Sequence, residues 1–237
     1  MKFSVIIPAH NEEKFIEKCF SSISTARANS TYPVEVIVCL NRCTDKTEEL
    51  VKNFGATLVY EDAKNLSKIR NTAAAAATGD IIVTLDADSQ MSANMFSEID
   101  RALSSGRFIG GGTKIKLERL SFGIIMSSLV ILPYAWAKKI PSAGLFWCLR
   151  KDFEAIGGFD VSKLTAEDLD FAHRLKAHGS LSKRSFGTLW KAHIITSCRK
   201  FDQFGDWYFF KNPKVVKSLF SGSDLKAANK FYYENKK

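Results

Sequence analysis

GDIIVTLDADSQ, from Gly79 to Gln90, is the most informative stretch of this chain because an uncharged, largely apolar run ends abruptly in two carboxylates. The run from Ile81 to Leu85 lacks the polar alternation of a strand with one wet face. It therefore predicts a strand buried on both faces, as in a parallel sheet covered by helices. Asp86 and Asp88 follow the run. Ligands of open parallel sheets bind outside the carboxyl ends of the strands, so we expect a site at these aspartates.

The spacing of the two aspartates suits a shared ligand. Residues i and i+2 of an extended chain point the same way and lie roughly 6.5 Å apart, so Asp86 and Asp88 can face one cation. Paired carboxylates favour Mg²⁺ or Mn²⁺, which also bind phosphate oxygens. The same Asp-x-Asp pattern occurs in polar turns, and its position after a buried strand is what favours a site.

Three strand, loop and helix units precede this stretch. Their strands are expected at Phe3–Ile7, Val34–Leu40 and Ala56–Tyr60. Such alternation predicts an α/β fold with a mostly parallel central sheet and right-handed crossovers. The loops at 8–13, 41–45 and 86–90 should then converge on one edge of the sheet. We expect these loops to build a nucleotide or cofactor pocket.

Capping residues predict where the helices of these units begin and end. Asn11 is expected to cap the first helix, and an Asp-x-x-Glu pattern at Asp45 is expected to start the second. Gly55 should end that second helix. The third helix is expected at 67–78, rich in alanine and closed by Gly79.

The regular alternation stops after the two aspartates. The later segments expected are a helix at 92–103, a glycine-interrupted strand at 108–117, a strand at 145–150 and a helix at 165–178 that ends before Gly179. No repeat or low-complexity linker marks a second domain. We therefore expect a single domain over residues 1–237.

The stretch from Leu120 to Ala137 carries no formal charge over eighteen residues, which is the lower edge of transmembrane length. Pro133, three serines and a glycine argue against a span. The segments on both sides are also expected to belong to one site, which a span would separate. We therefore expect a buried or interfacial helix here, with a true span as the alternative.

Composition limits the class of protein. With 46% hydrophobic residues, the chain can bury a sizeable core. Five cysteines without a Cys-x-x-Cys pair argue against a disulfide framework or a zinc ribbon, and no signal-like segment is present, so we expect a cytoplasmic protein. The net charge of +9 arises entirely after residue 175, where 13 basic residues face 4 acidic ones. An anionic partner is therefore expected: nucleic acid, anionic lipid or a phosphorylated substrate.

Six motifs, in this order, resemble the family of inverting, metal-dependent nucleotide-sugar glycosyltransferases with the GT-A fold. They are VIIPAHNEE at Val5–Glu13, VIVCLNRCTDKT at Val36–Thr47, LSKIRNTAAAAATGD at Leu66–Asp80, LDAD at Leu85–Asp88, LRKDFEAIGGFD at Leu149–Asp160 and AEDLDFAHRL at Ala166–Leu175. The resemblance extends from Phe3 to Gly205. It implies a Rossmann-like fold with a nucleotide-sugar-binding half at 1–106, an acceptor and catalytic half at 107–205 and a basic aromatic tail at 206–237.

The resemblance implies a nucleotide-sugar donor and a Mg²⁺ or Mn²⁺ ion that stabilises the departing diphosphate. Asp88 would bind the metal directly, and Asp86 would contact the ribose or a metal-bound water. The residues expected to line the nucleoside pocket are Pro8, Ala9, Asn11 and Glu12, with Asn41 at the base edge. Many members of the family carry two acidic residues where this chain has Leu40 and Asn41, so the identity of the base stays open.

Two basic and two acidic residues complete the site that the resemblance implies. Lys68 and Arg70 would lie near the base or the diphosphate, with solvated charges on a helix as the alternative. Inversion needs a carboxylate that accepts the proton of the attacking hydroxyl, and Asp168 is the candidate base. Glu167 would orient Asp168 or the acceptor. Acidic residues also favour helix N-termini, so a purely structural role is the alternative for this pair.

His193 is a further candidate metal ligand, because some GT-A relatives have a late histidine in this region. An ordinary structural histidine is the alternative. The uncharged stretch and the basic aromatic tail suggest contact with an anionic membrane and a lipid-linked or membrane-embedded acceptor. A solvated charged face with aromatic side chains packed on the sheet is the alternative.

Two other functions fit parts of the pattern. A sugar-phosphate nucleotidyltransferase also uses an α/β sheet with acidic metal ligands, but its first loop should be Gly-rich and basic, whereas this chain has PAHNEE at 8–13. A nucleic-acid-binding module would use the basic tail, but no recognised binding motif supports it. We therefore expect a glycosyltransferase, and more narrowly a hexosyltransferase.

Overall fold

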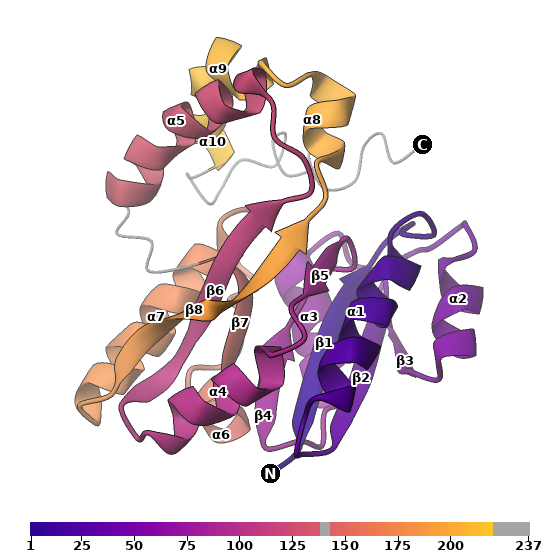
Figure 1. Cartoon of the computed structure of the whole chain (residues 1–237), viewed down its shortest axis with the longest axis vertical. Coiled ribbons are helices and arrows are strands. Elements are labelled where there is room, and N and C mark those ends of the chain that lie inside the picture. The colour runs from indigo at the N-terminus through magenta and orange to yellow at the C-terminus, as the bar shows by residue number, and fades with distance from the viewer. Residues whose placement is uncertain (138–142, 220–237) are drawn as a thin grey trace.

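Four parallel strands form the first half of the central sheet (Figure 1). The computed structural model describes residues 1–137 and 143–219 of the chain. The four strands are β1 (Phe3–Ala9), β2 (Val34–Leu40), β3 (Thr57–Tyr60) and β4 (Ile81–Thr84). In β1, Val5 pairs with Val36 of β2 on one side and with Val83 of β4 on the other. The carboxyl ends of β1, β2 and β4 therefore lie side by side.

Both faces of β1 and β4 are buried. Val5 and Val83 pack into the hydrophobic core on one face of the sheet, whereas Ile6 and Ile82 pack into the core on the opposite face. Side chains of successive strand residues point to opposite faces, so the uninterrupted apolar sequence fills both cores. The predicted doubly buried strand before Asp86 is therefore confirmed.

The second half of the sheet mixes strand directions. Its strands are β5 (Ser89–Met91), β6 (Phe108–Leu117), β7 (Ala143–Leu149) and β8 (Ser185–Thr196), and the order across the sheet is β3-β2-β1-β4-β7-β6-β8-β5. Strand β7 runs antiparallel to both β4 and β6, whereas β6 and β8 are parallel. The predicted α/β fold with a mostly parallel central sheet is confirmed, with β7 as the main reversal.

Helices cover each face of the sheet and complete the two cores. On one face lie α1 (Ile16–Ala28), α2 (Thr47–Phe54) and α4 (Met95–Ser104), and on the other lie α3 (Leu66–Ala75), α6 (Arg150–Ala155) and α7 (Glu167–Leu181). Phe20 and Ile23 of α1 face the first core at helical spacing, as the sequence predicts. Gly55 ends α2 with a left-handed φ of 78°, also as predicted.

A small helical cap lies beyond the ends of β6 and β8 (Figure 1). It consists of α5 (Phe122–Ala137), α8 (Arg199–Phe204), α9 (Tyr208–Lys211) and α10 (Pro213–Leu219). Phe209 and Val216 are its buried centre, and Val130 and Ile131 of α5 pack against them. Of the predicted basic tail at 206–237, residues 220–237 lie outside the described part of the chain.

The uncharged stretch forms α5. Within the described ranges, no helix is long and apolar enough to cross a membrane. Ile124 and Ser127 of α5 are fully buried, whereas Leu129 is half exposed. The helix is therefore partly buried and keeps an apolar outer face.

Three predicted helix boundaries are wrong for local reasons. Asn11 does not cap α1, which begins at Ile16; instead, Asn11 has a left-handed φ of 52° and its Oδ1 accepts a hydrogen bond from the Thr44 N–H at 2.8 Å. Helix α3 ends at Ala75, before Gly79. The role of Gly79 is a close approach, because a Cβ there would lie 2.5 Å from Ser4 Oγ.

The third difference concerns α7, which does not stop before Gly179. The helix continues to Leu181 and carries Gly179 inside it, where a Cβ would lie 2.6 Å from the Arg184 carbonyl oxygen. A glycine near a helical pattern's end thus marks tight packing here and not the helix terminus.

Candidate active site

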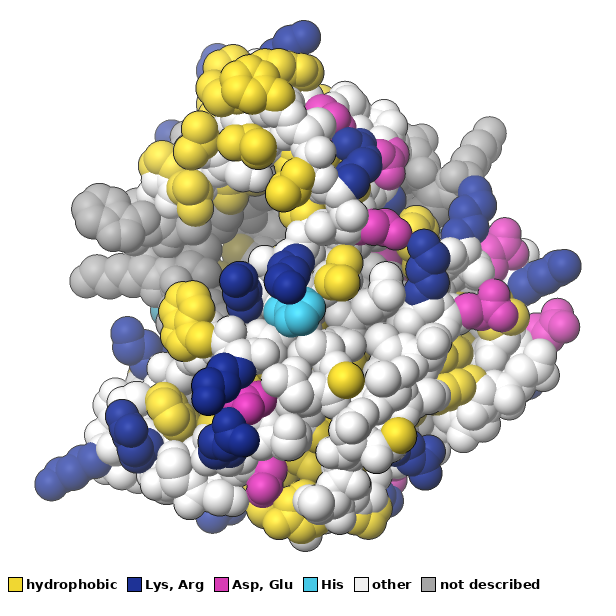
Figure 2. Space-filling view, viewed as in Figure 1, with side chains coloured by type: hydrophobic (Ala, Val, Ile, Leu, Met, Phe, Trp, Pro, Cys, Tyr) yellow, Lys and Arg dark blue, Asp and Glu magenta, His cyan; other side chains and the backbone are white. Residues whose placement is uncertain are grey.

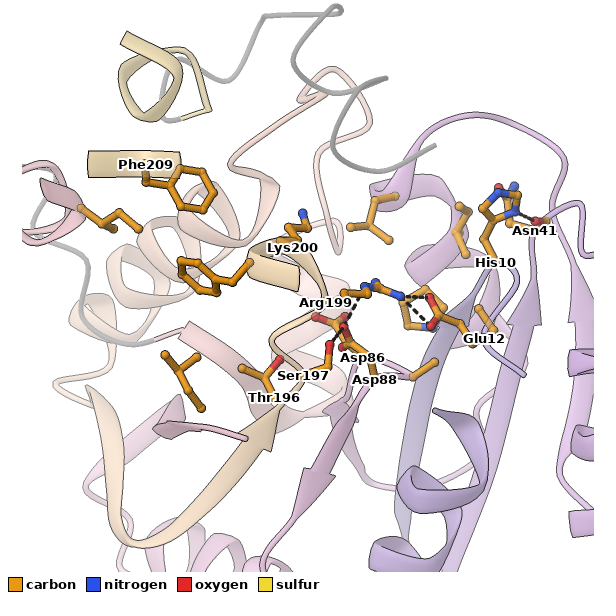
Figure 3. A pocket seen from close by; sticks show the side chains of 18 residues that line it. His10, Glu12, Asn41, Asp86, Asp88, Thr196, Ser197, Arg199, Lys200 and Phe209 are labelled. Atoms are coloured by element: carbon orange, nitrogen blue, oxygen red, sulfur yellow. Dashed lines mark hydrogen bonds and ion pairs between the residues drawn. The ribbon is translucent and has the colours of Figure 1, made fainter. Parts of the chain in front are cut away.

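Three loops that follow parallel strands meet at one edge of the sheet. His10 Nδ1, after β1, lies 2.6 Å from the Asn41 carbonyl oxygen, after β2. The turn after β4 carries Asp86 and Asp88 beside them (Figure 3). Adjacent parallel strands bring their carboxyl ends together, so these contacts follow from the strand order.

The loops enclose a cavity of about 340 Å³ (Figure 3). The predicted site residues that line it are Pro8, Ala9, Glu12, Asn41, Asp86 and Asp88. The other wall comes from the end of β8 and from the cap, including Ser197, Arg199, Lys200, Ile131 and Phe209. The N-terminal half and the C-terminal cap therefore share one cavity.

Asp86 and Asp88 do not adopt the extended geometry that the sequence argument assumes. The Ser89 N–H donates to the Asp86 carbonyl oxygen at 3.0 Å, which closes a turn between them. Each carboxylate then contacts a different arginine: Asp86 contacts Arg70, and Asp88 contacts Arg199. Both aspartates still line one cavity. A turn, and not the two-residue repeat of a strand, brings them there.

Arg70 connects the first aspartate to the start of α7. Its Nη2 lies 2.9 Å from Asp86 Oδ1, and its Nη1 lies 2.8 Å from Glu167 Oε1. The guanidinium is almost completely buried. Burial alone would lower the pKa of Arg70, but the charges of Asp86, Glu167 and Asp168 raise it. Arg70 is therefore a permanent cation inside an acidic cluster.

Glu167 and Asp168 lie at the beginning of α7, behind Arg70 and outside the cavity lining. Burial, followed by the neighbouring charge of Asp168, raises the pKa of Glu167 to about 7, against the lowering effect of Arg70. Glu167 Oε2 is buried and accepts no hydrogen bond from any residue in the described ranges. Asp168 is half-buried, so it retains access to solvent. The cluster thus holds closely spaced acids with different degrees of exposure.

Asn41 is fully buried at the edge of the cavity. Its Nδ2 donates to the carbonyl oxygens of Glu61 and Ala63, which fixes the orientation of the amide. Its Oδ1 has no donor among the described residues. The side chain therefore presents an unsatisfied acceptor to this end of the site.

Arg199 is the main residue that sequence reasoning missed. It begins α8, and its Nη1 lies 2.8 and 2.7 Å from the two carboxylate oxygens of Glu12. Its Nε lies 3.1 Å from Asp88 Oδ2, and the Ser197 Oγ donates to the same oxygen at 2.8 Å. Burial would lower the pKa of Arg199, but the charges of Asp88 and Glu12 raise it. The excess of basic residues after residue 175 was the only signal for this contact, which spans 187 positions.

Most of the chain matches a known protein family. The model for glycosyl transferase family 2 matches residues 4–156. The chain belongs to glycosyltransferase family 2. The matched range contains β1 to β4 and both aspartates, whereas α7 and the cap follow it.

Family 2 relatives include proteins of known activity. A dolichol-phosphate mannosyltransferase from Pyrococcus furiosus is 29% identical over 181 residues, which are 69% of this chain and 50% of that protein. The glycosyltransferase AglE from Haloferax volcanii is 32% identical over 94 residues, 36% of this chain and 30% of that protein. The matched parts of the chain therefore span half or less of the length of these relatives.

Solved structures confirm the GT-A-like fold. The mannosyltransferase PcManGT from Pyrobaculum calidifontis, solved with GDP-Man and Mn²⁺, has a TM-score of 0.65 at 20% identity, over 92% of this chain and 62% of that one. Glucosyl-3-phosphoglycerate synthase from Mycobacterium tuberculosis, solved with Mn²⁺ and UDP, has a TM-score of 0.59 at 20% identity, over 94% and 81%. S. aureus TarS has a TM-score of 0.63 at 18% identity, over 97% and 68%.

Besides Arg70, Glu167 and Asp168, three more residues that the family resemblance implies lie outside the cavity lining. Asn11 contacts the second loop, and Lys68 lies 3.2 Å from Glu61 on the exposed side of α3. His193 pairs with Lys114 in the β6–β8 ladder, and burial together with the charges of Lys116 and Lys114 lowers its pKa. The roles proposed for these residues stay predictions.

The donor set of this family 2 chain fits a divalent cation. In the part of the chain that the structure describes, no three His, Cys, Asp or Glu residues form a closed metal site. Asp86 and Asp88 nevertheless offer hard carboxylate oxygens beside the cavity. Mg²⁺ commonly binds through one or two carboxylates, with waters and substrate phosphates as its other ligands. Carboxylate and water oxygens also suit Mn²⁺, so an open site fits either ion.

Proposed function

We propose that this family 2 chain transfers a sugar from a nucleoside diphosphate to an acceptor hydroxyl with inversion at the anomeric carbon. The observation that supports this best is the single path of contacts from the cavity to α7. Asp86 lines the cavity, Arg70 bridges Asp86 to Glu167, and Asp168 is the next residue. A leaving-group site and a candidate base are thus held together by one buried arginine.

Asn41 is proposed to select the base of the donor. Its Oδ1 is an acceptor without a donor among the described residues, so it favours a base that presents a ring N–H. Uracil and guanine present one, whereas the corresponding ring nitrogens of cytosine and adenine are acceptors. The GDP-Man and UDP complexes of the similar structures are consistent with either of the first two bases. We therefore propose a UDP- or GDP-sugar donor.

Asp88 and Asp86 are proposed to hold the diphosphate end of the donor. A bound Mg²⁺ or Mn²⁺ ion supplies positive charge that stabilises the departing diphosphate. Asp88 would hold this ion, and Asp86 would contact the ribose or a metal-bound water. Because the buried guanidinium of Arg70 pairs with Asp86, whose own side chain is 44% exposed, this carboxylate is already oriented before the donor binds.

Asp168 is proposed to be the general base. Inversion requires the acceptor hydroxyl to attack from the side opposite the diphosphate, and a carboxylate there accepts its proton as the new bond forms. Glu167 is fully buried and held by Arg70, so it positions the start of α7 and leaves Asp168 for the acceptor.

Release of nucleoside diphosphate tests the proposal. The protein is incubated with Mn²⁺, a panel of nucleotide-sugars and a cell lipid extract as the acceptor source. We expect UDP or GDP release from one donor, and loss of this release on addition of EDTA. Pyrophosphate release from a nucleoside triphosphate and a sugar phosphate would instead show a nucleotidyltransferase and contradict the proposal.

The outer face of α5 supports a second proposal, that the enzyme docks on an anionic membrane surface. Four apolar residues at helical spacing, Phe122, Ile125, Leu129 and Leu132, are 47–68% exposed. Trp207 extends this stripe, with its ring centroid 5.7 Å from that of Phe122. Figure 2 shows hydrophobic side chains gathered over the same part of the cap. We call the stripe and Trp207 the α5 face.

Charge favours a membrane as the occupant of the α5 face. Lys211, Lys214 and Lys217 are exposed on α9 and α10, which pack against α5. Apolar side chains that enter the interface next to lysines that contact anionic headgroups are typical of peripheral membrane helices. Ile131 of the same helix lines the cavity, so docking through α5 would bring the site close to a lipid-linked acceptor.

Vesicle co-sedimentation tests the docking proposal. We expect binding to phosphatidylserine-containing vesicles, weaker binding to phosphatidylcholine alone, and loss of binding in Leu129→Glu. Leu181→Glu is the matched control, because Leu181 is an exposed leucine on α7, outside the α5 face. Equal binding by Leu129→Glu and the wild type, or no binding to any vesicle, would contradict the proposal.

A further inference from the structure

One guanidinium joins two carboxylates that come from different loops of the donor site. Arg199 Nη1 contacts both oxygens of Glu12 at 2.7 and 2.8 Å, while Arg199 Nε lies 3.1 Å from Asp88 Oδ2 (Figure 3). Glu12 belongs to the loop after β1, and Arg199 belongs to the first turn of α8. The contact therefore ties the cap to the nucleotide-binding half across the cavity.

The position of Arg199 overlaps with the position proposed for the cation. Asp88 Oδ2 already forms an ion pair with Arg199 Nε and accepts a hydrogen bond from Ser197 Oγ, so this oxygen of the proposed metal ligand has two protein partners. A divalent cation and a guanidinium about 4 Å apart repel each other by about 2 kcal/mol even in bulk water, a factor of roughly thirty in affinity. A cation and the guanidinium cannot both hold this oxygen without that cost.

We infer that Arg199 is an exchangeable latch for the donor site, an inference that rests on the proposed donor function. In the ligand-free protein, Arg199 holds Glu12 and Asp88 together. With the metal and diphosphate bound, Asp88 would hold the cation and would no longer pair with Arg199 Nε. Arg199 stays on Glu12, and its released N–H donates to the diphosphate.

Exposure supports exchange at Arg199. Its side chain is 29% exposed, so the released guanidinium is partly solvated at every stage. Glu12 offers two oxygens to one Nη1 and is only 4% exposed, which makes it the partner that stays. Asp88 offers a single oxygen to Nε, which makes it the partner that exchanges.

The latch also connects the donor to the acceptor side. Lys200 and Phe201 follow Arg199 in α8 and line the cavity. The Phe201 ring meets the Phe209 ring edge-on at 5.7 Å, and Phe209 is the buried centre of the cap. Exchange at Asp88 therefore loosens one of the contacts that fix α8 at the cavity.

Binding of Mn²⁺ alone tests the latch. Free Mn²⁺ is measured by electron paramagnetic resonance for the wild type, Arg199→Ala, and the control Arg107→Ala. Arg107 is an exposed arginine outside the cavity lining, so its removal changes the net charge equally. We expect Arg199→Ala to bind Mn²⁺ roughly thirtyfold more tightly than the wild type, because a competing positive charge is removed. We expect Arg107→Ala to match the wild type.

The second arm adds UDP or GDP in the presence of Mn²⁺. Here we expect Arg199→Ala to bind more weakly than the wild type, because the diphosphate has lost a donor. If Arg199 is a latch, Arg199→Ala binds Mn²⁺ alone more tightly and binds the nucleotide with Mn²⁺ more weakly. If Arg199 only binds the diphosphate, Arg199→Ala weakens nucleotide binding and leaves the affinity for Mn²⁺ alone unchanged. Arg199→Gln removes the charge with less change in shape. If the alanine variant unfolds, both binding measurements are made with Arg199→Gln.

Equal or weaker binding of Mn²⁺ by the folded Arg199 variants, or no binding by any protein, overturns the latch. The Mn²⁺ arm needs neither donor nor acceptor, so it is independent of sugar transfer. Tighter Mn²⁺ binding without any nucleotide-sugar turnover would overturn the proposed function and leave the exchange at Asp88 standing.

Discussion

Two arginines each bridge a pair of acids at this site, and they differ mainly in burial. Arg70 joins Asp86 to Glu167 with its side chain 6% exposed, whereas Arg199 joins Asp88 to Glu12 with its side chain 29% exposed. Both bridges begin at the same two-aspartate turn. One extends inward to α7, and the other crosses the cavity to the cap.

Burial determines what each bridge can do. Breaking the pair between Arg70 and Glu167 would leave an uncompensated charge in a medium of low polarity, because both side chains are buried, so this half of the Arg70 bridge is expected to stay intact through the reaction. A partly solvated pair can exchange partners at much lower cost. We therefore interpret the Arg70 bridge as the fixed frame of the site and the Arg199 bridge as its exchangeable part.

The largest expected effect is on Asp168, the proposed base, which follows Glu167 in the chain. Asp168→Asn should lower transfer by about 10²- to 10⁴-fold, the range for loss of a general base, while Mn²⁺-dependent nucleotide binding is retained. Asp170→Asn is the control, because Asp170 is also an acid in the first turn of α7 and pairs with Arg174. Equal losses in both variants would show that these acids only stabilise the helix N-terminus.

The two arginines should differ clearly in how much each contributes to the free energy of unfolding. Arg70→Ala leaves buried Glu167 without its cation, and we expect a loss of about 3–5 kcal/mol in the free energy of unfolding. Arg199→Ala should cost less than Arg70→Ala, because the Arg199 guanidinium is 29% exposed and water can partly replace it at Glu12 and Asp88. Urea unfolding of the two variants measures both values. A similar loss in both would contradict the division into a fixed and an exchangeable bridge.

A smaller effect is expected for donor binding at the shared turn. Asp88→Ala should weaken nucleotide binding in Mn²⁺ by about tenfold or more, since contacts to charged groups contribute about 1.5–3 kcal/mol. Without divalent cations, the variant and the wild type should bind the nucleotide similarly. Titration calorimetry with and without Mn²⁺ measures the difference. A loss of the same size in both conditions would assign Asp88 a role unrelated to the cation.

The most gradual effect is a pH slope from the buried acid of the Arg70 bridge. Burial and Asp168 raise the pKa of Glu167 from 4.5 to about 7, so the folded protein holds a proton that the unfolded chain releases. Its contribution to stability is therefore present below pH 4.5 and is lost as the pH rises through about 7. The slope is at most about 1.4 kcal/mol per pH unit.

Glu167→Gln tests this slope, because glutamine does not titrate. The free energy of unfolding of the wild type, minus that of the variant, should fall between pH 4.5 and about 7. A difference that is constant with pH would show that Glu167 has an ordinary pKa.

The sequence predicts the parts of this molecule that depend on local patterns. The apolar run before Asp86 predicts a doubly buried strand, and parallel strand order then places Asn41 beside the aspartates. Gly55 ends its helix because the left-handed conformation there favours glycine.

The features that the sequence does not predict depend on contacts between residues far apart in the chain. The capping role predicted for Asn11 fails because its side chain contacts Thr44 in the next loop. The contact between Arg199 and Glu12 spans 187 positions, so no periodicity or spacing indicates it. The turn at Asp86 and Asp88 is likewise set by partners on separate elements and not by the strand before it.

Thermal unfolding with a panel of nucleotide-sugars tests the central claim most directly, because a ligand that binds only the native state raises its apparent stability. The panel contains UDP-, GDP-, CMP- and ADP-sugars, each with Mn²⁺ or with EDTA, for the wild type and Asp88→Ala. We predict that a UDP- or GDP-sugar raises the unfolding temperature of the wild type only with Mn²⁺, and that Asp88→Ala loses this shift. Absence of a shift with every donor, or the same shift in Asp88→Ala, would contradict a cation-dependent donor site at this turn.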